Sequence, residues 1–230
     1  MTLSRERCKH VRMAELSERS GVATATIKYY LREGLLRPGR RVSATQAEYD
    51  EDHLRRLRLV RALIQVGRMP VATAREVLVA VEDESLDRHK RIGAAVWALP
   101  HGSPGPAGDG EGPDEVREEA TRAVDEALER IGWTFSRAEG DSSPAYRMLV
   151  DAVAGLSRTG YPCAPADLLA YARSAADLGA VDLDMVERYE PGAGQVEAAV
   201  ALTVLYEPVL LGLRRLAEAE ESNRRFGGGG

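Results

Sequence analysis

The sequence has few of the residues that mark several protein classes. Among its 230 residues there are two cysteines, Cys8 and Cys163, which lie far apart. Two cysteines are too few for the disulfide framework of a small secreted domain. Their spacing leaves open whether they are plain core thiols or a redox pair. Because a reducing cytosol disfavours disulfides, we expect plain thiols.

Catalytic signatures are also lacking. The four histidines, His10, His53, His89 and His101, are scattered, and none belongs to a serine or cysteine nucleophile motif. The sequence contains no HExxH, CxxC or P-loop motif. We therefore expect a protein that is not an enzyme, with no catalytic residues, no metal site and no cofactor.

Neither a charged-then-apolar signal segment nor an apolar run of membrane-spanning length stands out. We therefore expect a cytoplasmic protein without a membrane partner. Hydrophobic residues make up 44% of the chain, enough to form one larger or two smaller cores. The closing GGGG is left out of the fold prediction.

Charge is unevenly distributed. The chain has a net charge of −5, but residues 1–76 hold 16 Lys and Arg against 9 Asp and Glu, a net charge of +7. The remaining 154 residues therefore have a net charge of −12. A basic N-terminal part attracts the phosphate backbone of nucleic acid, whereas an acidic remainder is expected to face away from it. The alternative is a chance fluctuation of solvated charges.

Residues 11–49 predict a winged helix-turn-helix, the fold that places one helix in the DNA major groove. The first helix is expected over residues 13–19, burying Met13 and Leu16, and the turn is expected at Gly21. The second helix opens after Val22, with Thr24 as its N-cap. It closes at Gly34, a usual left-handed C-terminal residue.

The second helix has two distinct faces. Ile27, Tyr30 and Leu31 are spaced to face the core. The opposite face holds small, hydroxylated, basic and phenolic side chains that suit base edges and phosphates. These predicted DNA contacts are Thr24, Ala25, Thr26, Lys28, Tyr29 and Arg32.

A basic loop follows directly. Arg37, Arg40 and Arg41 flank a Pro-Gly pair, which predicts a turn whose cations hold DNA phosphates. Thr45 adds a predicted hydroxyl contact, and Tyr49 either does the same or packs under the wing. The alternative for the whole loop is a solvated basic segment.

GVATATIKYYLREGLL followed by RPGRR resembles the DNA-binding head of the MerR family of bacterial transcription regulators. Two features depart from the family pattern. Ala23 stands where a capping Ser is frequent, and Ala25 where an arginine is frequent. The wing reads SATQAEY in place of the usual Gly-Tyr-Arg. The family's metal-sensing branch uses clustered cysteines, which this chain does not have, so the resemblance does not imply metal sensing.

The resemblance implies a homodimer on an inverted repeat of double-stranded DNA. It further implies that the protein bends and untwists a promoter with an overlong spacer, so that RNA polymerase contacts both promoter elements. Repression by occlusion uses the same contacts. The operator, the target genes and the sign of regulation are not given by the sequence.

Further helices complete the head and extend beyond it. Residues 51–66 form a predicted amphipathic helix with Leu54, Leu57 and Val60 inward and Arg56 off the buried stripe. Pro70 opens another helix, which completes a DNA-binding domain over residues 1–83. Arg68 lies at the turn between them, where it either reaches a phosphate or is solvated. A helix over residues 84–99 is the first candidate for the dimer interface.

Residues 100–113 contain nine prolines and glycines in fourteen positions, which predicts a linker or loop. Residues 114–226 are expected to form an all-helical domain for effector binding, dimerisation or both. Its predicted helices run from Asp114 to about Phe135, from Ser143 and Pro144, and from Pro165. A last helical region over 194–224 is expected to kink or split at Pro208. No strand pattern or internal repeat appears.

Nine of the twelve aromatic residues lie beyond Glu84. Aromatics at this density usually belong to a core, but an acidic helical domain with buried aromatics also suits a cationic or flat apolar effector. The candidate effector-binding residues are Trp133, Tyr146, Tyr171, Tyr206 and Glu207.

The sequence thus predicts an all-α fold, with a MerR-like winged helix-turn-helix followed by a helical bundle that loosely resembles the regulatory domain of TetR-type repressors. The predicted function is a homodimeric transcription regulator that responds to a small molecule. The alternative is a small-molecule binding or sequestering protein whose helix-turn-helix is vestigial or binds protein. Salt dependence of DNA affinity separates the two.

Overall fold

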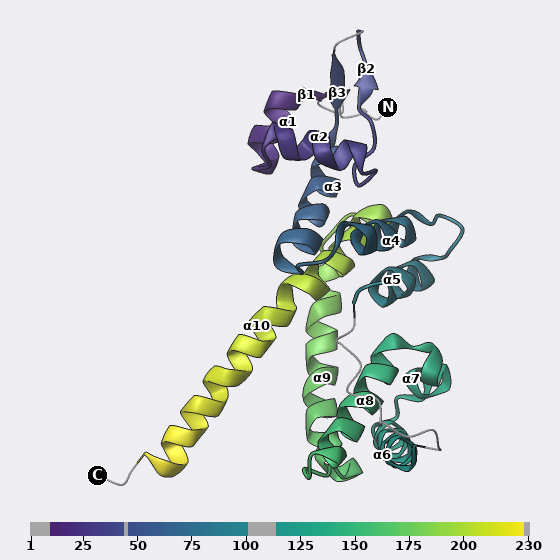
Figure 1. Cartoon of the computed structure of the whole chain (residues 1–230), viewed down its shortest axis with the longest axis vertical. Coiled ribbons are helices and arrows are strands. Elements are labelled where there is room, and N and C mark those ends of the chain that lie inside the picture. Colours follow the sequence, from purple (N-terminus) through teal and green to yellow (C-terminus); the bar gives the residue numbers. More distant parts are fainter. Residues whose placement is uncertain (1–9, 44–45, 101–113, 228–230) are drawn as a thin grey trace, which may run out of the picture. The chain divides into compact units, whose positions relative to one another are not determined.

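The computed structural model describes residues 10–43, 46–100 and 114–227, which divide into two compact units (Figure 1). Unit 1 comprises residues 1–98 together with 186–230, and unit 2 comprises residues 99–185. The last helix therefore belongs with the N-terminal head. The sequence had predicted instead that it belongs to the C-terminal bundle. The expected linker lies outside the described residues except for Pro100.

Helices dominate both units, which confirms the predicted all-α fold class. Unit 1 contains α1 (Met13–Ser20), α2 (Thr24–Arg32), α3 (Glu51–Arg61), the π-helical turn η1 (Ala62–Val66), α4 (Val71–Glu82), α5 (Arg88–Trp97) and α10 (Ala193–Phe226). Unit 2 contains α6 (Glu115–Ile131), α7 (Thr134–Glu139), the 3-10 turn η2 (Gly140–Ser142), α8 (Pro144–Arg158) and α9 (Pro165–Val186), whose last residue falls in unit 1.

Unit 1 also contains a small antiparallel sheet, which the search for strand patterns missed. Its strands, in the order β1-β3-β2, are β1 (Val11–Arg12), β3 (Ala47–Tyr49) and β2 (Arg40–Arg41). Strands of two or three residues are too short to show an alternating pattern. Gly39 precedes β2 where a Cβ would lie 2.7 Å from the Glu48 backbone oxygen, so this close approach requires glycine.

The turn between α1 and α2 is held from three sides. Gly21 closes α1 with a φ of 65°, the left-handed conformation that glycine adopts readily. The Ser17 hydroxyl donates to the Val22 carbonyl at 2.6 Å, and Arg61 Nη1 of α3 donates to the Ser20 carbonyl at 2.8 Å. The helix-turn-helix is thereby fixed onto α3.

The start of α2 differs from the prediction. Ala23, and not Thr24, is the N-cap, and no side chain caps the helix. Thr24 is the first helical residue. Alanine has no side-chain acceptor, so the tight α1–α2 turn fixes the start of this helix in place of a hydroxyl cap.

Two reciprocal hydrogen bonds cap the N-terminus of α3. Asp50 accepts a hydrogen bond from the His53 backbone N–H, and His53 Nδ1 accepts one from the Asp50 backbone N–H, each at 3.2 Å. Although burial opposes it, hydrogen bonding to His53 lowers the pKa of Asp50. This capping box fixes the junction between the wing and the helix that carries the core of the head.

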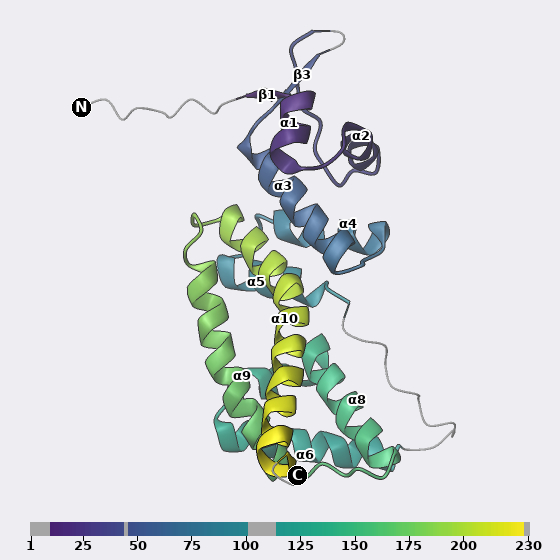
Figure 2. The same ribbon diagram turned by 90° about the vertical axis from the view of Figure 1, so that its left-hand side faces the viewer.

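The first half of α10 packs against α3, η1, α4 and α5 (Figures 1 and 2). Its buried side chains include Val196, Val200 and Val204, and Arg88 of α5 donates to Gln195 at 3.0 Å. The helix then continues through Pro208, so of the two predicted outcomes, a kink or a split, the split is wrong. Its second half extends away from α3, α4 and α5 in Figure 1.

By length and composition α10 qualifies as a membrane span, with an 18-residue window of mean hydropathy 1.7. The sequence analysis had found no such run, because Glu197 and Glu207 interrupt the apolar residues. Core helices of soluble proteins can meet the same criterion, and 28% of this window is buried in the structure.

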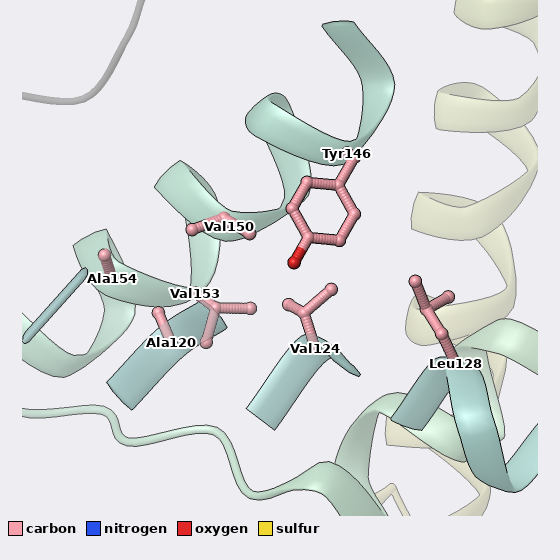
Figure 3. Close-up of a cluster of buried hydrophobic side chains, with 7 residues drawn as sticks. All are labelled: Ala120, Val124, Leu128, Tyr146, Val150, Val153 and Ala154. Carbon is pink, nitrogen blue, oxygen red and sulfur yellow. The ribbon is translucent and has the colours of Figure 1, made fainter. Parts of the chain in front are cut away.

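Unit 2 has its core between α6 and α8. Figure 3 shows Tyr146 and Val150 of α8 pointing toward Val124 and its neighbours on α6. Asp114 and Ser143 cap these two helices, as predicted. The first ends at Gly132, with a φ of 80°, before the expected Phe135, because the chain turns there into α7.

Candidate nucleic-acid interface

The two faces of α2 are arranged as the sequence predicts. Ile27 and Tyr30 are buried under α2, whereas Lys28 and Arg32 are exposed on its outer side. Tyr29 is 37% exposed, with its ring 6.0 Å from that of Tyr30. Of the other predicted contacts, Ala25 is exposed and Thr24 and Thr26 are half-buried. The outer side of α2 thus groups hydroxyl, amine, guanidinium and phenol groups around small residues.

The C-terminal end of α2 is tied to α4. Arg75 donates to the Glu33 carbonyl from Nε at 2.9 Å and from Nη2 at 2.5 Å. Burial raises the pKa of Tyr30, whose ring lies beneath the helix. Core packing of Tyr30 and the hydrogen bonds from Arg75 to Glu33 fix the orientation of α2, and therefore of its outer side.

The arginines of the wing differ in whether they form ion pairs within the protein. Arg40 pairs with Glu48 across the β2–β3 ladder at 2.6 Å, and Arg37 pairs with Glu82 at 3.1 Å. Both guanidinium groups remain largely exposed. Arg41 is exposed and forms no ion pair with the described residues, so it is the wing cation most available to a phosphate.

Two further wing residues were named in the sequence analysis. Thr45 lies outside the described residues. Tyr49 is 4% exposed and meets the His53 ring edge-on at 5.2 Å, so it packs under the wing and does not face outward. Burial raises the pKa of Tyr49.

Arg56 supports the wing from inside the head, a role that the sequence analysis missed. Predicted to lie off the buried stripe of α3, it is buried instead. Its Nε donates to the Leu35 carbonyl at 3.0 Å, and its Nη2 pairs with Glu82 at 2.9 Å. Burial lowers the pKa of Arg56, and Glu82 opposes that effect. The signal available was the run of Leu59 and Leu63 at i+3 and i+7 from Arg56, which marks its side of the helix as inward.

The candidate effector residues divide between the units. Trp133 lines a groove against α9, and Tyr146 lines a separate cavity where its hydroxyl donates to Asp125 at 2.8 Å. Burial raises the pKa of Tyr146 to about 12. Tyr171 is exposed on α9, while Tyr206 and Glu207 lie on α10 in unit 1. Their role in effector binding stays a prediction.

Comparison with known proteins fits this geometry. Residues 11–80 match the model of the MerR HTH family regulatory protein. The chain is also similar to the crystal structure titled "putative transcriptional regulator SCO5550 from Streptomyces coelicolor A3(2)", with 52% identity and a TM-score of 0.80. That match covers 94% of this chain and 98% of the other. The chain belongs to the MerR family.

The MerR match includes α1, α2, the wing, α3 and almost all of α4. As a MerR protein the chain is a DNA-binding transcription regulator. The structural match also spans unit 2 and α10, so the relative shares both units with this MerR protein. No match was found among curated proteins.

Proposed function

We propose that this MerR protein acts as a homodimer on an inverted-repeat operator or promoter and responds to a small molecule. Two heads related by a twofold axis read the two half-sites. Bending and untwisting of the promoter then lets RNA polymerase engage it, or occupancy of the same site blocks it. Such a regulator works in the cytoplasm, where the DNA is.

The second half of α10 carries this proposal. Val209, Leu213 and Leu216 are 46%, 59% and 66% exposed, and their spacing of four and three residues places them on one side of the helix. We call these three residues the α10 stripe. Exposed apolar residues at heptad spacing are typical of a helix that pairs with another helix. A second copy of α10 is the partner that a twofold dimer provides.

The structure favours α10 over the helix that the sequence analysis selected for dimerisation. The predicted helix at 84–99 is α5, which has 10 residues and packs against α4 and α10 of its own chain. In contrast, α10 has 34 residues. Its stripe lies in the half that extends beyond the other helices of unit 1 (Figure 1).

Within each head we assign base reading to α2 and phosphate binding to the wing. Thr26 and Lys28 lie toward the N-terminal half of α2, the part of a recognition helix that meets base edges. Arg37, Arg40 and Arg41 follow on the adjoining loop and strand, where their charges meet the DNA backbone.

Replacing Thr26 or Lys28 with alanine is expected to change the selected half-site sequence. Each replacement removes hydrogen-bonding groups that face bases, and a good bidentate contact discriminates by about 1–3 kcal/mol. The measurement is binding-site selection with each variant and with the wild type. If both variants select the wild-type half-site, this side of α2 does not read bases.

The Arg41→Ala variant is expected to weaken binding to all sequences and to reduce the slope of log affinity against log salt by about 0.9. One phosphate contact is lost, and phosphate contacts position the protein without specifying sequence. Fluorescence anisotropy on one duplex over a salt series measures the slope. The control is Arg122→Ala, which removes an exposed cation from α6 of unit 2. Equal slopes for wild type and Arg41→Ala would exclude this wing contact.

The same salt series on the DNA upstream of the protein's own coding region tests the proposed function. A dimeric operator reader shows sequence preference together with a steep slope. The alternative, a protein that binds or sequesters a small molecule, shows weak, sequence-blind binding and would displace the proposal.

A further inference from the structure

Unit 1 contains an apolar cavity between α3 and the first half of α10, with a volume of about 350 Å³. We call it the α3–α10 cavity. Volumes of this order accommodate small organic molecules. Leu59 and Ala62 line it from α3 and η1, Tyr189 lies at its edge, and the remaining apolar walls are Ala198, Ala201, Leu202 and Leu205 of α10.

Glu197 of α10 lines this cavity together with Arg55 and Arg58 of α3, and these three side chains form its polar part. The Glu197 side chain is 16% exposed, and its Oε2 accepts no hydrogen bond from the described residues. Arg55 Nε forms an ion pair with Oε2 at 3.5 Å, which is long for a hydrogen bond, while Arg55 Nη2 donates to Asp52 at 2.6 Å. Although Arg55 and Arg56 oppose it, burial raises the pKa of Glu197. A buried carboxylate oxygen without a donor is costly to the fold unless a donor reaches it.

The backbone changes its winding beside the cavity. Ala62, which lines it, is the first residue of the π-helical turn η1. At the end of this turn a Cβ on Gly67 would lie 2.8 Å from Val204 of α10, so the turn and α10 approach as closely as glycine allows. π-helical turns are uncommon and often occur at functional sites.

From these observations we propose that the α3–α10 cavity binds a small, mainly apolar molecule whose polar end donates a hydrogen bond to Glu197. The apolar walls take the body of the molecule, with the Tyr189 ring at its side. An ammonium or a hydroxyl end donates to the exposed part of the Glu197 carboxylate. A carboxylate end would instead face the Glu197 carboxylate.

This site deepens the proposed function, on which its role as the effector site rests. It touches α3, which also packs against α1 of the helix-turn-helix, and it touches α10, which carries the proposed dimer stripe. A molecule that binds one packing arrangement of α3 against α10 more tightly increases the population of that arrangement. Because α3 belongs to the head and α10 to the proposed dimer interface, the change affects both.

Three indole compounds that share a ring and differ at the polar end test the inference on the full chain without DNA. The probes are tryptamine, tryptophol and indole-3-propionate, which present an ammonium, a hydroxyl and a carboxylate. Isothermal titration calorimetry is expected to show binding of the first two and at least about tenfold weaker binding of the third. Comparable binding of the carboxylate would overturn the assignment of Glu197.

Variants locate the binding. Glu197→Gln is expected to lower the affinity for tryptamine by about tenfold, because the charged acceptor is lost. Ala201→Phe fills the cavity and is expected to abolish binding of tryptamine and tryptophol. Glu220→Gln, an exposed change on the same helix, leaves both affinities unchanged. Unaltered binding in Glu197→Gln and in a folded Ala201→Phe variant would place the probes elsewhere and refute the site.

A second copy of the chain is the competing occupant. Leu202 and Leu205 lie on α10 a short distance before the α10 stripe, so a partner helix in the dimer has a path over the cavity. Probe binding that appears only in a variant with glutamate at 213 and 216 would show that the partner fills the cavity, which would overturn the proposal. Because these titrations contain no DNA, failure to bind probes leaves the proposed DNA function standing, and failure of the DNA function leaves the binding result intact.

Discussion

Replacing both Leu213 and Leu216 with glutamate is expected to convert the dimer into a monomer and to lower affinity for an inverted repeat by about a hundredfold or more. Both side chains are more than half exposed on one side of α10. In the proposed helix pair, two introduced carboxylates face two more on the partner and repel them. The second head then binds as an independent molecule, and the gain from linking two half-sites is lost.

Analytical ultracentrifugation gives the mass of the variant, and anisotropy on full and half sites gives its affinities. Leu211→Glu is the matched control, since Leu211 is 48% exposed on the same helix but about 200° around its axis from Leu213. The control is expected to remain dimeric. A double variant that stays dimeric and keeps full operator affinity would exclude the α10 stripe as the dimer interface.

Replacing Arg56 with alanine is expected to lower the free energy of unfolding of unit 1 by about 2–3 kcal/mol. The change removes the hydrogen bond to the Leu35 carbonyl and leaves Glu82 without the nearer of its two arginine partners. It also opens space beneath the loop that leads to the wing. We expect the operator affinity to fall as well, because this loop sets the position of the wing relative to α2.

Urea unfolding followed by circular dichroism measures the first effect. Arg58→Ala, an exposed change two residues further along α3, is the control and is expected to cost less than about 0.5 kcal/mol. If Arg56→Ala were as stable as Arg58→Ala, the buried guanidinium of Arg56 would not stabilise unit 1 as its contacts indicate.

The DNA-binding head was largely predictable because its signals are local. Ile27 and Tyr30 mark the buried face of α2 by their spacing, and Gly21 and Pro70 mark a helix end and a helix start. Periodicity and cap residues act within a few positions of the chain, so one sequence suffices to read them. The departures also have local causes: Ala23 lacks a capping hydroxyl, and the strands of the wing are too short to alternate.

The packing of α10 was not predictable in the same way. Its contact with α3 joins residues more than a hundred positions apart, for example Arg55 and Glu197. Periodicity shows that a helix has an apolar face but not which helix covers it. For this reason Tyr206 and Glu207 were grouped with the aromatics of unit 2, and the α3–α10 cavity could not be foreseen. Local rules predicted that Pro208 kinks the helix or splits it, and the split does not occur, because the helix continues on both sides of it.

Selection of binding sites from random and genomic DNA fragments by the purified full-length protein tests most directly whether it reads an inverted repeat as a dimer. We expect enrichment of one inverted repeat whose half-sites change in the Thr26→Ala or Lys28→Ala variant. Recovery of single, unpaired half-sites would contradict the dimer, and recovery of no sequence above background, with or without added effector probes, would contradict the assignment as an operator-reading regulator.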